Sequence, residues 1–136
     1  MLVLKAPRRM LLLRGTRVLR EYPVALGKNP LGPKRHHLDR RTPEGRYAID
    51  GRNEQSRFHR ALHISYPNER DRELAREAGL APGDGVMIHG LPNGESWVGD
   101  VHRKYDWTNG CIAVTDDEMD EIWELVDDGT PIEIRP

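Results

Sequence analysis

The amino-acid sequence predicts a single domain that is mostly β-sheet with two helices. Three observations favour this class. The chain has 136 residues, which is enough for one hydrophobic core and too few for two. It contains 13 Gly and 10 Pro but only 6% aromatic residues, a composition typical of a loop-rich β protein. Finally, only two stretches carry the start and stop signals of a helix.

The N-terminal half is expected to form strands separated by turns and one long polar loop. Arg14-Gly15-Thr16 predicts a hairpin turn, and the Gly, Pro and Asn content of residues 27–34 predicts the start of the loop, which continues to residue 43. Alternation from Phe58 to Ser65 predicts a strand whose polar face carries His59 and His63. The expected strands of this half are 2–5, 9–13, 17–26, 42–49 and 58–65.

The C-terminal half carries both predicted helices. Asn68 is a good N-cap for a helix over 69–78 that ends at Gly79. The second helix starts at Thr115, with Glu118 completing a capping box, and stops at Asp128-Gly129. Its predicted core stripe is Met119, Ile122, Trp123 and Val126. Short strands are expected at 86–89 and 131–134, which makes about seven strands in total.

The overall charge excludes some classes of partner. With 21 basic and 22 acidic residues the net charge is −1, so no nucleic-acid partner is expected. No stretch is long enough to span a membrane. Residues 10–13 are too short for a signal-peptide core, so the chain as written would stay in the cytoplasm unless an export signal is supplied elsewhere or has been trimmed. His36-His37 lacks the Cys or carboxylate spacing of a zinc site, and no metal is expected.

Cys111 is the only cysteine, so it cannot close an intramolecular disulfide. It could be a buried inert thiol, a metal ligand, an intermolecular link or a nucleophile. Gly110 before it leaves room for a carbonyl substrate and frees the backbone to present N–H groups to an oxyanion. A neighbouring imidazole is the usual means of producing a thiolate near neutral pH, and with His89 in that role we expect a thiol pKa below that of free cysteine.

The sequence resembles the L,D-transpeptidase (YkuD-like) catalytic domain of bacterial cell-wall enzymes over nearly its whole length. The family's His followed by Ser/Thr-x-Gly-Cys is read here as His89-Gly90 and Thr108-Asn109-Gly110-Cys111. The Asp-Trp-Thr-x-Gly-Cys-Ile-Ala form of residues 106–113 is similar to one branch of the family. Further matches are Gly27-Lys28-Asn29-Pro30, Thr42-Pro43-Glu44-Gly45-Arg46-Tyr47 and His63-Ile64-Ser65-Tyr66-Pro67.

The resemblance implies one catalytic domain over residues 1–136 with a YkuD-like β-sandwich fold. Cys111 would attack a carbonyl of a peptidoglycan stem peptide, and the resulting thioester would pass to an amine or to water. His89 would move the proton. The residues that would hold the oxyanion or position the dyad of Cys111 and His89 are Gly110, Asn109, Thr108 and Gly90. The resemblance also implies no cofactor, inhibition by carbapenems, a monomer, and work in the periplasm or cell envelope.

Two departures from the family pattern bear on substrate handling. Asn109 stands where many relatives have a second histidine, and Ala113 stands where many have an arginine that helps place the substrate. His63, His59 and Arg57 are candidate substitutes. Other residues have open interpretations: Trp107 is a substrate wall or core, and His102 is a cover for the cleft or, preferably, a solvated loop histidine. Trp123 is predicted to be core.

Several functions are compatible with these residues. The leading prediction is an L,D-transpeptidase, a cysteine acyltransferase of the cell wall. The alternatives are a hydrolase of the same bond (an L,D-carboxypeptidase or an amidase that releases wall-linked protein), the catalytic domain of a wall-targeting toxin, and a non-catalytic wall-binding module. The intact His-Gly and Thr-x-Gly-Cys pair argues against the last, because binding alone requires no thiol.

Overall fold

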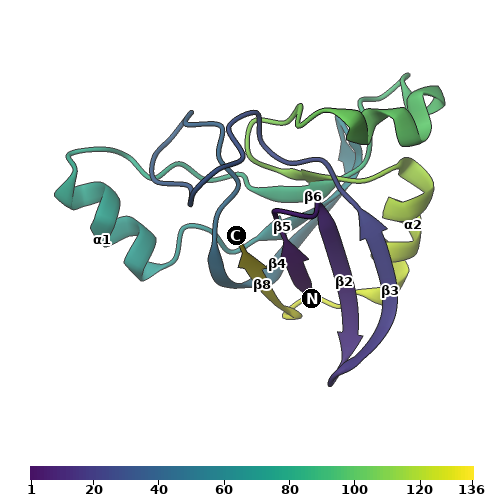
Figure 1. Cartoon of the computed structure of the whole chain (residues 1–136), viewed down its shortest axis with the longest axis horizontal. Helices are drawn as coiled ribbons and strands as arrows, with labels where there is room; N and C mark the ends of the chain where they lie inside the picture. Colours follow the sequence, from purple (N-terminus) through teal and green to yellow (C-terminus); the bar gives the residue numbers. More distant parts are fainter.

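A mixed eight-stranded sheet in the order β3-β2-β1-β8-β4-β5-β6-β7 organises the molecule (Figure 1). The computed structural model describes residues 1–136. Only the β1–β8 and β6–β7 pairs are parallel. The strands are β1 (Leu2–Leu4), β2 (Arg9–Arg14), β3 (Arg17–Pro23), β4 (Gly45–Ser56), β5 (His59–Ile64), β6 (Met87–His89), β7 (Ile112–Ala113) and β8 (Pro131–Arg135).

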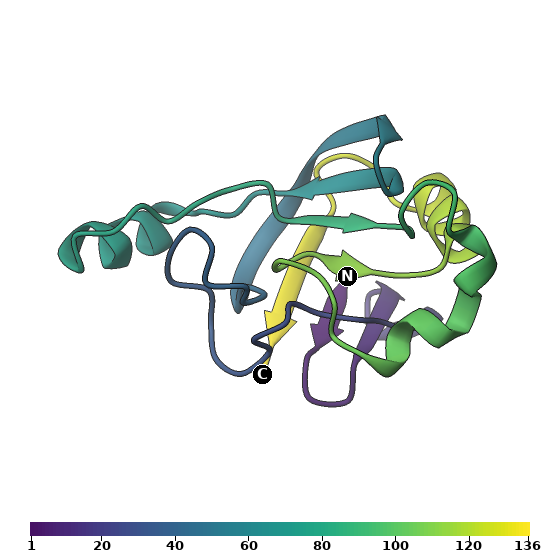
Figure 2. The same cartoon turned by 90° about the horizontal axis from the view of Figure 1, so that it is seen from above.

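The long strand β4 joins the two halves of the sheet. Its first part pairs with β8 through Gly45 to Ala48, and its second part pairs with β5 from Ile49 onward. Register shifts between Ile49 and Gly51 and between Asn53 and Ser56 bend the strand, as bulges do. Figure 2 shows β8 crossing the direction of β6 and β7, so the two halves form the layers of a sandwich. The expected mostly β fold is confirmed.

The hairpin β2–β3 forms where the sequence predicts it, but β3 ends at Pro23 rather than at residue 26. Beyond Pro23 the chain leaves β2 and crosses to the other half of the sheet. There Ala25 exchanges backbone hydrogen bonds of 3.0 and 2.9 Å with Ala113. Val24, Ala25 and Leu26 are completely buried. Burial of three consecutive side chains explains why the sequence continues to read as strand past the true end.

Both predicted helices form with their predicted caps. The N-cap of α1 (Glu69–Glu77) is Asn68, and that of α2 (Asp116–Leu125) is Thr115, whose capping box with Glu118 is complete. The stripe of α2 enters the core through Met119, Ile122 and Val126. Trp123 is only partly buried at the edge of the core, where the guanidinium groups of Arg52 and Arg60 lie over its ring at 4.9 and 5.2 Å. The prediction that Trp123 is core is therefore half right.

Two elements were not predicted from the sequence. The first is a 3₁₀ segment, η1 (Ser96–Lys104), in which Gly99 adopts φ 52° and divides it into two short pieces. The second is the two-residue strand β7. The structure thus has eight strands and three helical segments where seven and two were expected. None of its helices is both long and apolar enough to cross a membrane.

Candidate active site

The register of β6 and β7 brings Cys111 and His89 to one face of the sheet. These parallel strands pair Ile88 with Ile112 and His89 with Ala113. Ile88 and Ile112 are completely buried in the core. Side chains alternate along a strand, so His89 and Cys111, each one residue away from this pair, point to the opposite face. Neighbouring strands are about 4.8 Å apart, so the imidazole and the thiol belong to one site.

The environment of His89 fixes its protonation state. Its side chain is buried, and Nδ1 lies 2.7 Å from the carbonyl oxygen of Gly90. A carbonyl only accepts hydrogen bonds, so Nδ1 carries the proton and Nε2 keeps a free lone pair. Phe58 stacks on the ring at a centroid distance of 4.3 Å, and Trp107 packs at 5.7 Å. Burial lowers the pKa of His89 to about 4, which leaves the imidazole neutral at neutral pH.

Cys111 is a protonated thiol in this environment. Its Sγ donates to the carbonyl oxygen of Gly85 at 3.5 Å. Burial raises the pKa of the thiol, and this effect exceeds the opposite effects of the Met87 backbone N–H and the charge of Lys34. The expected depression of the Cys111 pKa is therefore wrong for the resting structure. A neutral thiol beside a neutral imidazole calls for proton transfer during the reaction rather than a preformed ion pair.

Thr108 shapes the turn that presents Cys111. Its hydroxyl donates to the Cys111 carbonyl at 2.7 Å and accepts the Gly110 N–H at 3.1 Å. Gly110 adopts φ 135°, a conformation that favours glycine. Because the Gly110 N–H is already bonded, Gly110 is not an oxyanion donor, contrary to expectation. The N–H groups of Asn109 and Cys111 have no partner in the structure and remain available.

Gly90 positions His89 through its backbone. The Gly90 carbonyl accepts a hydrogen bond from Nδ1–H of His89, and the Gly90 N–H donates to Phe58 O at 2.9 Å. A side chain is excluded at this position, because an ideal Cβ would lie 2.5 Å from Asp116 Oδ1. That carboxylate also accepts the Leu91 N–H at 2.8 Å. The predicted positioning role of Gly90 is thus given a physical basis by these contacts.

The loop of residues 27–43 packs directly on the turn before Cys111. An ideal Cβ on Gly27 would lie 2.2 Å from Arg40 O and 3.1 Å from Gly110 Cα. The Gly27 N–H donates to the Thr42 hydroxyl at 3.0 Å, and the Lys28 N–H donates to Thr108 O at 3.0 Å. Only a residue without a side chain allows three backbone segments to meet this closely.

The remaining candidates divide into residues near the dyad and residues turned away from it. His63 pairs with Met87 in the β5–β6 register, so it lies on the same face as His89 and Cys111, where its Nδ1 is hydrogen-bonded to the Asp50 carboxylate. His59 is bound at Nε2 to Asp120 Oδ1 at 2.6 Å and is therefore committed to helix α2. Arg57 lies exposed in the turn between β4 and β5.

Trp107 and His102 form a connected pair over His89. The indole Nε1–H donates to His102 Nδ1 at 3.2 Å, which orients the ring that packs on His89. His102 is buried, so the prediction of a solvated loop histidine is wrong. Its burial lowers its pKa to about 4, which keeps Nδ1 available as an acceptor.

Sequence reasoning missed two contributors to this site. Phe58, the only phenylalanine, begins the predicted strand over 58–65 without any sign of a role at the site, yet it stacks on His89. Lys34 lies in the polar loop that begins at residue 27, yet its side chain is buried. No group of three or more His, Cys, Asp or Glu side chains is arranged to hold a metal ion.

Known proteins resemble this chain in sequence and in fold. The model of the YkuD family, the L,D-transpeptidase catalytic domain, matches residues 1–134. The chain belongs to this family. The L,D-transpeptidase chain is 32% identical over 113 residues to "Putative L,D-transpeptidase YafK" of Escherichia coli K12, covering 80% of this chain and 37% of that protein. It therefore spans well under half the length of this curated relative.

Solved structures share the fold of this L,D-transpeptidase domain. The helical cell shape determining protein Pgp2 from Campylobacter jejuni superposes with a TM-score of 0.75 and 24% identity, covering 98% of this chain and 46% of Pgp2. The LD transpeptidase LdtMt1 in complex with imipenem has a TM-score of 0.62 and 18% identity, with 98% of this chain and 57% of that chain covered. At these identities the likeness shows the fold alone.

Proposed function

We propose that this chain is a cysteine acyltransferase that acts on stem peptides of peptidoglycan, with residues 1–136 as one catalytic domain. Family membership supports the substrate class. The observation that carries the mechanism is the state of His89. Its Nδ1–H is held by Gly90 O, and its neutral Nε2 is on the same face of the sheet as Cys111. We therefore propose His89 as the general base: its Nδ1–H stays bonded to Gly90 O while its Nε2 gains and loses a proton.

In the first half of the reaction the thiol rotates away from Gly85 O and transfers its proton to His89 Nε2. The sulfur forms a bond to the carbonyl carbon of the donor peptide, and the carbonyl electron pair moves to the oxygen. The unpaired N–H groups of Asn109 and Cys111 stabilise this oxyanion. When the carbonyl re-forms, the C–N bond breaks and the amine leaves with the proton from His89, so a thioester remains on Cys111.

In the second half an acceptor amine attacks the thioester. Its proton passes to His89 Nε2, the C–S bond breaks, and the sulfur recovers the proton. The product is a new amide, which would be a cross-link in the cell wall. The substrate class assigns this activity to the cell envelope, and carbapenems are expected to acylate Cys111 as donor analogues.

Hydrolysis of the same thioester is the second candidate function. Ala113 is completely buried between Ala25 and His89, so no cation is supplied from the position where relatives carry an arginine. Without that fixed cation, a substrate carboxylate loses a bidentate partner and water competes better with the amine. His63 is the polar side chain of this face that we propose for contact with the substrate, with Trp107 as a wall.

Purified muropeptides incubated with the protein, with products identified by mass, test the proposal. Cross-linked dimers support transfer, and shortened stems support hydrolysis. Cys111→Ala and His89→Gln should each abolish both products, whereas Asp128→Asn, at an exposed loop far along the chain, should retain them. Unchanged muropeptides with native protein, together with no imipenem adduct in the intact mass, would contradict the proposal.

A further inference from the structure

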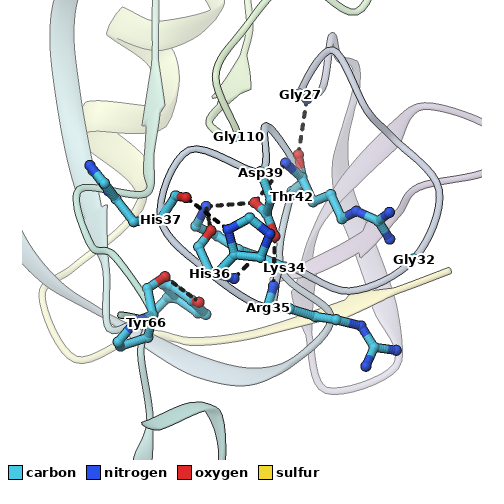
Figure 3. A network of polar contacts seen from close by, with 12 residues as sticks. Gly27, Gly32, Lys34, Arg35, His36, His37, Asp39, Thr42, Tyr66 and Gly110 are labelled. Atoms are coloured by element: carbon cyan, nitrogen blue, oxygen red, sulfur yellow. Dashed lines mark hydrogen bonds and ion pairs between the residues drawn. The ribbon is translucent and has the colours of Figure 1, made fainter. Parts of the chain in front are cut away.

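The loop of residues 27–43 contains a buried ion pair that the mechanism above does not use. Lys34 Nζ lies 2.8 Å from Asp39 Oδ1, and both side chains are only 5% exposed. Figure 3 shows the network around this pair, in which Nζ also donates to His36 O at 3.0 Å. Desolvating two charges generally offsets their attraction, so a buried pair is weak evidence for a purely stabilising role.

Asp39 fixes the position of the Lys34 side chain, because its own carboxylate is held by several hydrogen bonds. Its carboxylate accepts the backbone N–H groups of Arg35, His36 and Arg41 in addition to the Lys34 ammonium. These hydrogen bonds lower the Asp39 pKa despite its burial, so the carboxylate is ionised at neutral pH. The Lys34 ammonium has three N–H donors and two acceptors in this network, so its charge is fixed in position but not fully satisfied.

The ammonium group lies near Tyr66, which connects the loop to the turn beside Cys111. Nζ is 5.9 Å from the centroid of the Tyr66 ring. The Tyr66 hydroxyl donates to Pro82 O at 2.8 Å, at the start of the turn whose Gly85 carbonyl accepts from Cys111 Sγ. The His37 N–H donates to Ala81 O at 2.8 Å and ties the loop to the same turn.

The loop also contacts the turn that precedes Cys111. Arg41 O lies 2.8 Å from the position of an ideal Cβ on Gly110. The loop that buries Lys34 therefore contacts both segments that flank the thiol, the 81–85 turn and the 108–111 turn. An interior position of this kind strengthens electrostatic interactions relative to those at the surface.

The other charged or titratable groups near the thiol do not compete with Lys34. His89 on β6 is neutral, and His63 on β5 is engaged by Asp50. Asp84, in the turn beside Gly85, is exposed and screened by water. Lys34 is thus a buried cation in the loop that contacts both flanks of the site, and its charge opposes the effect of burial on the Cys111 pKa.

We propose that Lys34 is an electrostatic positioning residue for Cys111, whose fixed positive charge stabilises the thiolate formed when the thiol proton passes to His89 Nε2. The loop thereby supplies, from a distant part of the sequence, a cation beside the thiol in a chain that has Ala113 in place of an arginine. The role rests on the proposed function only in taking Cys111 as the nucleophile. The thiolate itself can be measured without peptidoglycan.

The test is the pH dependence of Cys111 alkylation by iodoacetamide, followed by intact mass. The rate reports one site because the chain has a single cysteine. Asp39→Asn keeps an acceptor oxygen but removes the charge that neutralises Lys34, so alkylation below the thiol pKa should be about threefold faster. Lys34→Met combined with Asp39→Asn removes both charges, and alkylation should be about threefold slower than in the native protein.

The opposite directions separate electrostatics from structure, because looser packing would speed both variants at every pH. A matched control is the second buried pair, in which Lys5 Nζ contacts Glu44 at 3.0 Å and also anchors this loop through Gly32 O and Thr42 O. Lys5→Met with Glu44→Gln should leave the midpoint of the pH profile unchanged.

The proposal is overturned if the double variant, Lys34→Met with Asp39→Asn, keeps the native midpoint of the pH profile of alkylation. It is also overturned if this double variant and Asp39→Asn alone shift the midpoint in the same direction. Should the double variant fail to fold, Asp39→Asn decides alone, and an unchanged or raised midpoint overturns the proposal. Inactivity on muropeptides with the predicted alkylation profile would contradict the proposed function while leaving the role of Lys34 intact.

Discussion

Gly27→Ala should destabilise the protein and displace the turn that carries Cys111. Gly27 has no positive φ, so alanine is acceptable to its own backbone and only the surroundings matter. The added Cβ would lie 2.2 Å from Arg40 O and 3.0 Å from Arg40 C. Ordinary C···O contacts are about 3.3 Å, so the segments must separate by about 1 Å. Neither neighbour is a flexible side chain that could move aside.

Overpacking of this kind costs about 1–3 kcal/mol. For a chain of this size the melting temperature should fall by about 4 °C per kcal/mol. A displacement of about 1 Å at a reacting group can slow a reaction by about 10²-fold, so acylation of Cys111 by imipenem should be at least about tenfold slower. Thermal denaturation by circular dichroism and intact-mass kinetics measure the two effects.

Gly51→Ala is the matched control for this substitution. It also lacks a positive φ, and its ideal Cβ would lie at an ordinary 3.4 Å from His63 Cβ. Its melting temperature should stay within about 2 °C of the native value, since such changes cost about 0.5 kcal/mol or less. If Gly27→Ala melts at the same temperature as Gly51→Ala and reacts at the native rate, the inferred close packing of the three segments is wrong.

Three further predictions concern pH, the core and Ala113, two residues after the thiol. The His89 pKa is about 4 when folded and about 6.5 when unfolded, so the unfolded chain binds the proton first and stability should fall by up to about 3 kcal/mol as pH drops from 6.5 to 4. Urea denaturation at several pH values should show this loss together with a similar one from buried His102, so His89→Gln should remove about half of the total. Ile122→Ala should lower the free energy of unfolding by about 2–5 kcal/mol, because the side chain is completely buried. Trp123→Ala should lower it less, by about 1–2 kcal/mol, because Trp123 is only partly buried. Equal losses for the two variants in urea denaturation would contradict the partial burial of Trp123. Ala113→Arg should prevent folding or cost more than about 3 kcal/mol, because it buries a charge, while Asn109→Arg at an exposed turn should fold normally by circular dichroism.

The sequence predicts best what depends on local signals. The capping box of Thr115 and Glu118 and the motif around Cys111 are contiguous, so the helix, the fold family and the candidate dyad could be predicted. The 3₁₀ segment η1 could not, because it has no helical periodicity and Gly99 interrupts it. The two residues of β7 are too few to show an alternation.

Burial that depends on distant segments could not be predicted. Burial raises the pKa of Cys111, whose thiol contacts Gly85 in a distant turn, and nothing near Cys111 in the sequence indicates this. His102 was expected in solvent because its partner, Trp107, cannot be inferred from spacing. His59 satisfies the alternation of its strand, but φ 70° and the carboxylate of Asp120 direct its ring to α2.

The segment between β6 and β7 is anchored at both of its ends by hydrogen bonds to other parts of the fold. At one end, Asn93 Nδ2 donates to Ser56 O at 3.0 Å and its N–H donates to Arg57 O at 2.9 Å. At the other, Asp106 accepts the Leu26 N–H at 3.0 Å and pairs with Arg8 at 2.7 Å. Residues 94–105 can therefore change in length or composition without moving the strands that carry the imidazole and the thiol, provided that His102 is kept to orient Trp107 over His89. Under the proposed function, substrate selectivity can diverge in this segment without any change to the reacting groups.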